Sequence, residues 1–125
     1  MITLEVVVAD APTVELLTSG DLEQRRVRTL PELAGFVADH ADGLSSEHLE
    51  LLGRLAAVLA WFEPSAAMAR DARSLGKIVD SYYFDAGPPE KSEAFDRGLA
   101  EALRQLRLLW DRPEADQVKQ VLQVS

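Results

Sequence analysis

The chain has no cysteine among its 125 residues. Disulfide bonds and thiolate metal ligands are therefore excluded, and the hydrophobic core alone must stabilise the fold. Apolar residues make up 47% of the chain, and a chain of this length can bury roughly two thirds of its unfolded surface. We expect one domain over residues 1–125, in the reducing environment of the cytoplasm.

Long hydrophobic runs are also missing. The longest nearly uncharged apolar run extends from Leu55 to Phe62, far short of the roughly 20 residues that a membrane helix needs. The segment from Met1 to Glu5 has no basic residue and includes a carboxylate, which is untypical of a secretory signal. We therefore expect neither membrane insertion nor secretion.

Positive charge is scarce. Thirteen Lys and Arg stand against 21 Asp and Glu, a net charge of −8, which repels phosphate backbones and anionic membranes at long range. Direct binding to nucleic acid or to a membrane is therefore not expected. Residues 31–63 contain only one base, Arg54, against six acids: Glu32, Asp39, Asp42, Glu47, Glu50 and Glu63.

No pattern in the chain predicts catalysis, a metal or a cofactor. The glycines form neither a dinucleotide-binding nor a P-loop motif, and no serine lies in a G-x-S-x-G motif. The two histidines, His40 and His48, are eight residues apart rather than the four that a zincin helix needs. Placing Gly43 at position six of an EF-hand puts Ala38 and Leu49 at ligand positions, so that pattern fails as well.

Residues 1–30 are predicted to be a short antiparallel β-section of two to three strands. Ile2, Leu4, Val6 and Val8 alternate with other residues at the period of two that a half-buried strand requires. Two further extended pieces follow, and a three-stranded meander is the preferred interpretation. The alternative for the middle piece is a short helix from Ala11 to Ser19.

Residues 31–125 are predicted to form four to five helices. Thr29 to Glu32 has the form of a capping box, and the helix that begins there is expected to end with a left-handed glycine near Asp42-Gly43. Ser45 or Ser46 should cap a second helix, which reaches Phe62 and is apolar almost all round, as a central buried helix would be. Gly53 in this helix and Gly98 in a later one are expected to let neighbouring helices approach closely.

Three more helices are expected after residue 64. Ser65 is predicted to cap the third, and the fourth follows Pro88-Pro89 with apolar residues at steps of four and three. Asp111 is predicted to cap a short terminal helix, although Val118–Val124 also has strand character and could pair with the N-terminal sheet. The predicted fold class is α+β, predominantly helical, with the β-section packed on the helices.

Besides the acidic residues, the chain has a run of three aromatic residues at positions 82–84, with Asp80 and Asp85 on either side of it. Tyrosine is enriched at interface hot spots, so the tyrosines and the neighbouring acids are candidates for contact with a partner. The predicted partner-binding residues are Asp39, Asp42, Glu47, Glu50, Tyr82, Tyr83 and Asp85.

We expect a non-enzymatic protein-binding module whose acidic surface docks a basic protein partner, as an inhibitor, an immunity-type neutraliser or an adaptor would. One alternative is a structural homo-oligomeric subunit, in which the acidic helices of one copy meet Arg70, Arg73 and Lys77 of another. The other is a small enzyme or ligand-binding domain that uses His40 or His48 with nearby carboxylates. Composition and spacing do not identify the partner or the oligomeric state.

Overall fold

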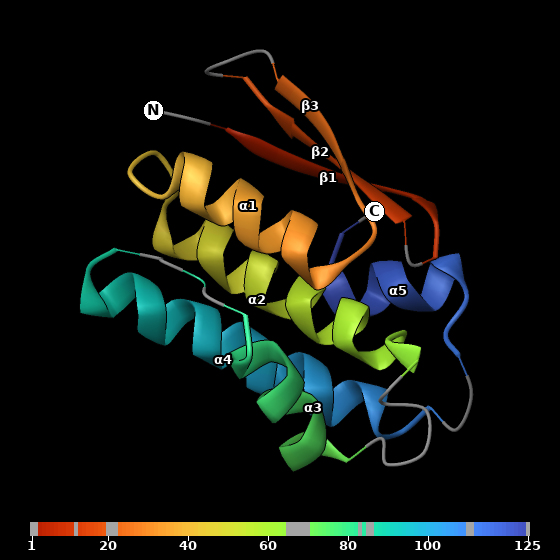
Figure 1. The fold of residues 1–125 in the computed structure, drawn as a ribbon. Helices are drawn as coiled ribbons and strands as arrows, with labels where there is room; N and C mark the ends of the chain where they lie inside the picture. The colour runs from red at the N-terminus through yellow and green to blue at the C-terminus, as the bar shows by residue number, and fades with distance from the viewer. Residues whose placement is uncertain are drawn as a thin grey trace.

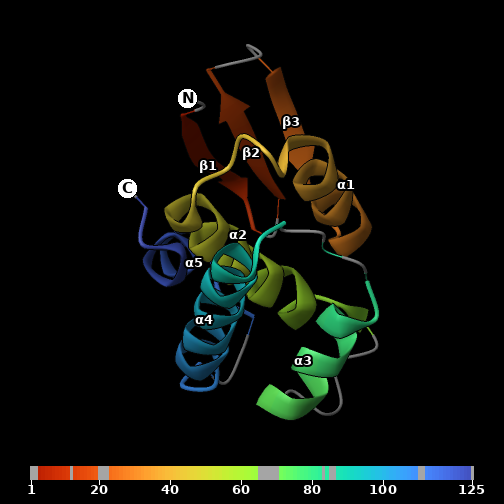
Figure 2. The ribbon, with the colours of Figure 1, turned by 90° about the vertical axis from the view of Figure 1, so that its left-hand side faces the viewer.

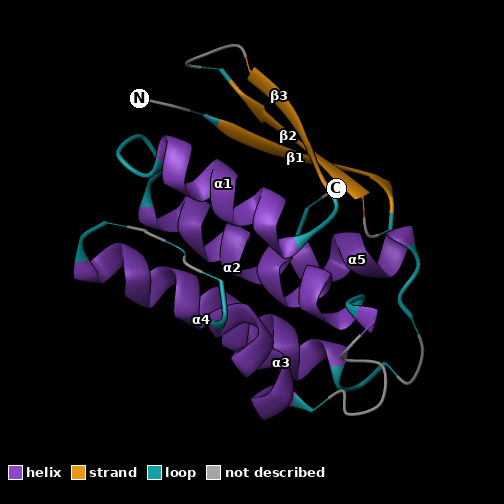
Figure 3. Ribbon diagram, viewed as in Figure 1, coloured by secondary structure: helices purple, strands orange, loops and turns teal. Residues whose placement is uncertain are grey.

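The computed structural model describes residues 3–11, 13–19, 23–64, 71–82, 84, 87–109 and 112–124. A three-stranded sheet lies over one side of a helical layer, and two further helices lie on the opposite side of that layer (Figures 1 and 2). The strands come first in the chain and the helices follow (Figure 3), which confirms the α+β class. Within these residues, no helix combines the length and the apolar character needed to cross a membrane.

The β-section is an antiparallel meander with the strand order β1-β2-β3, made of β1 (Leu4–Asp10), β2 (Thr13–Thr18) and β3 (Glu23–Val27). Val14 in the middle strand pairs with Val8 on one side and with Val27 on the other. All three side chains are buried, so they form the face of the sheet that packs on the helices. The preferred meander is confirmed, and the alternative helix from Ala11 to Ser19 is wrong.

Helix α1 (Leu30–His40) begins where the sequence predicts, with Thr29 as its N-cap. The hydroxyl of Thr29 donates to the Glu32 carboxylate at 3.0 Å and makes no bond to the helix backbone. The backbone N–H of Arg28 donates to the same carboxylate oxygen at 3.3 Å. The predicted reciprocal capping box is therefore wrong, because Glu32 bonds the residues before the helix and Thr29 caps no N–H.

The turn after α1 needs no left-handed glycine. The helix ends at His40, and its C-cap Ala41 is right-handed, with φ −50°. The backbone N–H groups of Gly43 and Leu44 both donate to the His40 carbonyl, at 3.0 and 3.2 Å. Among the glycines of the described ranges, only Gly87 has a positive φ. The prediction for Gly43 is wrong, because these two bonds already satisfy the helix end.

Helix α2 (Ser46–Trp61) is the centre of the molecule, as predicted. Ser45 caps it: its hydroxyl accepts the N–H of His48, and the His48 ring nitrogen Nδ1 accepts the N–H of Ser45, both at 3.2 Å. Every residue from Leu52 to Trp61 is buried. The helix contacts all four other helices, which explains why its second half is apolar all round.

The remaining helices are α3 (Ala72–Asp80), α4 (Pro89–Leu106) and α5 (Ala115–Leu122). Asp71 caps α3 by accepting the N–H of Ser74 at 2.9 Å, whereas the predicted cap, Ser65, lies outside the described residues. Glu114 caps α5, so the prediction that Asp111 does so is wrong.

The C-terminal segment is helical, and the alternative of a strand paired with the sheet is wrong. Val118, Val121 and Leu122 are all buried, and at helical spacing they lie on one face. The helix ends with Gln123 in the left-handed region, at φ 59°, and the N–H of Val124 donates back to the Lys119 carbonyl at 3.0 Å. This bond closes the last turn in the manner of a Schellman motif.

Candidate functional site

Two of the predicted partner-binding acids are already paired with arginines. Asp39, near the end of α1, accepts a hydrogen bond from Arg25 of β3 at 3.0 Å. Glu50 is in the second turn of α2, and its Oε2 atom lies 3.6 Å from Nη2 of Arg97 in α4. Exposed ion pairs of this kind add about 0–1 kcal/mol to stability. Their larger consequence here is that Asp39 and Glu50 present less negative charge to a partner.

Asp42 and Glu47 are the predicted acids that remain without an ion pair among the described residues, and the tertiary structure places the helix that bears Glu90 and Glu93 beside them. The Lys91 ammonium donates to the Ala41 carbonyl at 3.2 Å, which places the start of α4 beside the turn between α1 and α2 (Figures 1 and 2). Three segments that bear acidic residues therefore meet at one end of the molecule, and all of these acids are exposed. This acidic end consists of Asp42, Glu47, Glu90 and Glu93.

The acidic end keeps most of its charge. Within the described ranges, none of its four carboxylates lies within 4.0 Å of a lysine, arginine or histidine nitrogen. Lys91 is half-buried and directs its ammonium to a backbone carbonyl. Four carboxylates and this one ammonium leave a net charge of −3 at this end, so it attracts cations over about a Debye length.

The aromatic part of the predicted patch is described only at Tyr82. Tyr82 follows α3 and is half-buried against the hydrophobic core. Tyr83 and Asp85 lie outside the described residues. In the part of the chain that is described, no hydrogen bond or ion pair connects Tyr82 with the acidic end.

Both histidines have local structural roles. The His40 ring is buried and stacks on Phe36, with ring centroids 4.5 Å apart and Nδ1 3.1 Å from the Phe36 carbonyl. His48 closes the capping box of α2, and burial lowers its pKa below the ordinary value, an effect that Glu47 opposes. Across the described segments, no group of three or more His, Asp and Glu side chains is arranged to hold a metal ion.

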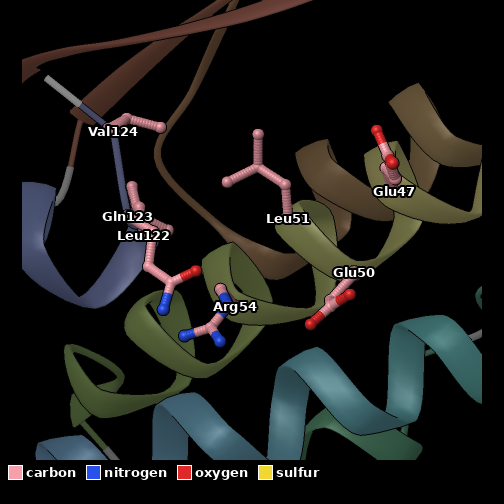
Figure 4. A pocket seen from close by; sticks show the side chains of 7 residues that line it. All are labelled: Glu47, Glu50, Leu51, Arg54, Leu122, Gln123 and Val124. Atoms are coloured by element: carbon pink, nitrogen blue, oxygen red, sulfur yellow. The ribbon is translucent and has the colours of Figure 1, made fainter.

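A hollow of about 360 Å³ lies next to the acidic end, and Glu47 borders both. Figure 4 shows its lining, in which Leu51 points up from α2 while Glu50 and Arg54 point down towards α4. Arg54 is only 6% exposed, and it donates a hydrogen bond to the Val121 carbonyl of α5 at 3.1 Å.

Arg54 was not among the residues that the sequence predicts for the site. A signal was present, because Arg54 is the one Lys or Arg within residues 31–63 and the only charged residue of the buried stretch from Leu52 to Trp61. Which acids lie within ion-pair distance of it depends on the tertiary structure, which pairs Glu50 with Arg97 and Glu101 with Arg104. Comparisons of the chain with models of protein families, with curated proteins and with solved structures found no match.

Proposed function

We propose that this chain is a non-enzymatic protein-binding module whose acidic end docks a basic segment of a protein partner. The observation that carries the proposal is that the segments bearing Asp42, Glu47, Glu90 and Glu93 meet at one end of the molecule, with these acids exposed and without ion pairs among the described residues. Unpaired surface acids repel one another, so their convergence slightly destabilises the fold. A basic partner would relieve that repulsion.

The electrostatics also favour fast association. A lopsided charge steers an oppositely charged partner and raises the association rate, and the effect weakens as salt screens it. The net charge of −8 acts in the same direction as the local charge of the acidic end. An inhibitor, an immunity-type neutraliser or an adaptor for a basic protein would use such a surface.

The test is an affinity capture from native lysate with two matched variants, at about 50 mM and 500 mM salt, between which the Debye length falls severalfold. The first variant neutralises the acidic end: Asp42→Asn, Glu47→Gln, Glu90→Gln and Glu93→Gln. The control removes the same charge at exposed acids elsewhere: Glu5→Gln, Asp10→Asn, Asp80→Asn and Asp116→Asn. Both variants have a net charge four units less negative than the native chain.

The expected result is a stoichiometric basic protein that the native chain and the control retain at low salt. The acidic-end variant should lose that protein, and high salt should release it from all three. Retention by the acidic-end variant, or loss that is equal in both variants, would contradict docking at this surface. Self-association through Arg73 and Lys77 of α3 predicts instead a salt-dependent dimer in analytical ultracentrifugation.

A further inference from the structure

Two hollows flank Arg54 of α2, one bordered by α5 and the other by α4. The first, of about 360 Å³, lies beside the acidic end, the second has about 500 Å³, and Glu50 and Arg54 line both. The first hollow has an apolar wall of Leu51, Leu122 and Val124 (Figure 4). The second is completed by residues of α4, namely Arg97, Ala100, Glu101 and Arg104.

Arg54 lines both hollows, and its hydrogen bond goes to a neutral group rather than to a carboxylate. Its hydrogen bond goes to the backbone carbonyl of Val121, and within the described residues no carboxylate lies within 4.0 Å of its guanidinium. The two nearby glutamates, Glu50 and Glu101, form their ion pairs with Arg97 and Arg104. The pKa of Glu101 is lowered chiefly by its hydrogen bond from Arg104 and, to a smaller extent, by the charge of Arg54.

The guanidinium of Arg54 keeps N–H groups that are open to a ligand. The Val121 carbonyl uses one of the five N–H donors that Arg54 offers, and among the described residues no Arg54 nitrogen is buried without a partner. Arg54 lines two hollows that open to solvent. An anion that enters either hollow can therefore reach it.

We propose that Arg54 anchors a binding site for a carboxylate that carries a short apolar group. The carboxylate would accept the remaining guanidinium N–H groups, which suit bidentate recognition. The apolar group would pack on the wall formed by Leu51, Leu122 and Val124. The site differs from the proposed docking surface for a basic protein in its anchor, Arg54, and in its apolar wall, although Glu47 borders both.

The surroundings of Arg54 select a singly charged anion. Glu47 and Glu50 border the first hollow, and they repel a phosphate, which has nearly two negative charges, more strongly than a carboxylate. The apolar wall offers nothing to a phosphate oxygen, whereas it removes a hydrocarbon group from water. The same chemistry is found in a free carboxylic acid and in the C-terminus of a peptide, and the experiment distinguishes these two sources.

The test is an NMR titration of the native chain with four probes: 4-methylpentanoate, N-acetyl-L-leucine, N-acetyl-L-leucinamide and inorganic phosphate. The first two should shift the Nε–Hε signal of Arg54 and the backbone amides of Leu51 and Gln123, with a Kd on the order of millimolar for ligands of this size. The amide should bind at least about tenfold more weakly, because it lacks the charge-assisted hydrogen bonds. Phosphate should leave these signals unchanged.

The relative affinity of 4-methylpentanoate and N-acetyl-L-leucine shows whether the natural ligand is a free carboxylic acid or a peptide C-terminus. Tighter binding of 4-methylpentanoate supports a free carboxylic acid, and tighter binding of N-acetyl-L-leucine supports a peptide C-terminus. Equal binding of acid and amide, or no binding at 20 mM (about tenfold above the expected Kd), would overturn the proposal. Shifts spread over exposed arginines such as Arg26 and Arg107 would overturn it too, since they indicate unspecific attraction of anions.

Variants provide a second test. Arg54→Met keeps the approximate volume and removes the charge, so binding of both acids should be lost. The matched control is Arg107→Gln, which removes an exposed arginine at the end of α4 and should leave the Kd unchanged. If Arg54→Met does not fold, the comparison of acid with amide on the native chain still decides the matter. Unchanged affinity in a folded Arg54→Met variant would refute the role of Arg54.

Discussion

The backbone of Gly98 in α4 lies directly against the backbone of Glu50 in α2. A Cβ atom built on Gly98 would be 1.9 Å from the Glu50 carbonyl oxygen, and one built on Gly53 would be 2.1 Å from the carbonyl oxygen of Phe95. Both distances are far below van der Waals contact. The crossing of α2 and α4 therefore needs a glycine on each helix, and this crossing holds Glu50 beside Arg97.

Gly98→Ala should destabilise the protein by about 3 kcal/mol or more, because the added methyl must push two backbones apart in a packed core. The measurement is urea unfolding followed by circular dichroism. Gly35→Ala in α1 is the control, since a Cβ there meets no atom within 4 Å. It should stabilise the protein by about 0.5–1 kcal/mol, the usual gain of alanine over glycine in a helix. A Gly98→Ala variant as stable as the native chain would show that the helices do not cross this closely.

The capping box of α2 should weaken in acid. The pKa of His48 is lowered in the fold, chiefly by burial, so the neutral ring stabilises the protein. That contribution is complete above the ordinary histidine pKa of about 6.5 and is lost as the pH falls through the lower pKa of the folded state. Protonated Nδ1 can no longer accept the N–H of Ser45.

His48→Gln tests this dependence, because glutamine suits the same capping position and does not titrate. Relative to this variant, the native chain should lose stability between pH 7 and pH 5, within the about 1 kcal/mol that an N-cap contributes. Urea unfolding at several pH values measures the difference. Parallel pH profiles for the two proteins would contradict the role of His48 in the cap.

Asp71 should stabilise the start of α3 in its ionised form. The backbone N–H of Ser74, and secondly the Ser74 hydroxyl, bond the carboxylate and lower its pKa. Its contribution is therefore present above the pKa of an unfolded aspartate and lost as the pH falls through the lower folded value. Asp71→Ala should lower the Tm at pH 7, and Asp71→Asn, which can still cap, should lower it less. Equal losses for the two variants would show that the cap does not act through this hydrogen bond.

Asp96 should destabilise the fold when it is ionised. Burial, and secondly the charge of Asp80, raise its pKa, so protonation favours the folded state. The penalty appears as the pH rises through the folded pKa and persists at neutral pH. Asp96→Asn should therefore raise stability at pH 7 by about 0.3 kcal/mol, a small effect because solvent screens the site. Glu5→Gln, at an exposed acid of β1, is the control. Thermal unfolding at pH 7 and pH 3 should show the gain of Asp96→Asn only at pH 7.

The elements of this fold were largely predictable because each depends on local pattern. Alternation marks the strands, the apolar stretch from Leu52 to Trp61 marks the buried helix, and Ser45 marks its start. Predictions at helix ends failed where several polar residues compete to cap within a few positions. Glu32 accepts hydrogen bonds from residues before its helix, and Glu114 is the N-cap of α5, neither of which the spacing of the residues indicated.

The sequence alone determined the order of the elements, a β-section followed by helices, because alternation and helical periodicity are properties of neighbouring residues. Only the tertiary structure decided which distant charges meet. The close crossing of α2 and α4 pairs Glu50 with Arg97, and the start of α4 lies beside the turn that bears Asp42. The packing of α5 on α2 gives Arg54 its hydrogen bond to the Val121 carbonyl. Those relations depend on packing across more than 40 residues of chain, which no local pattern records.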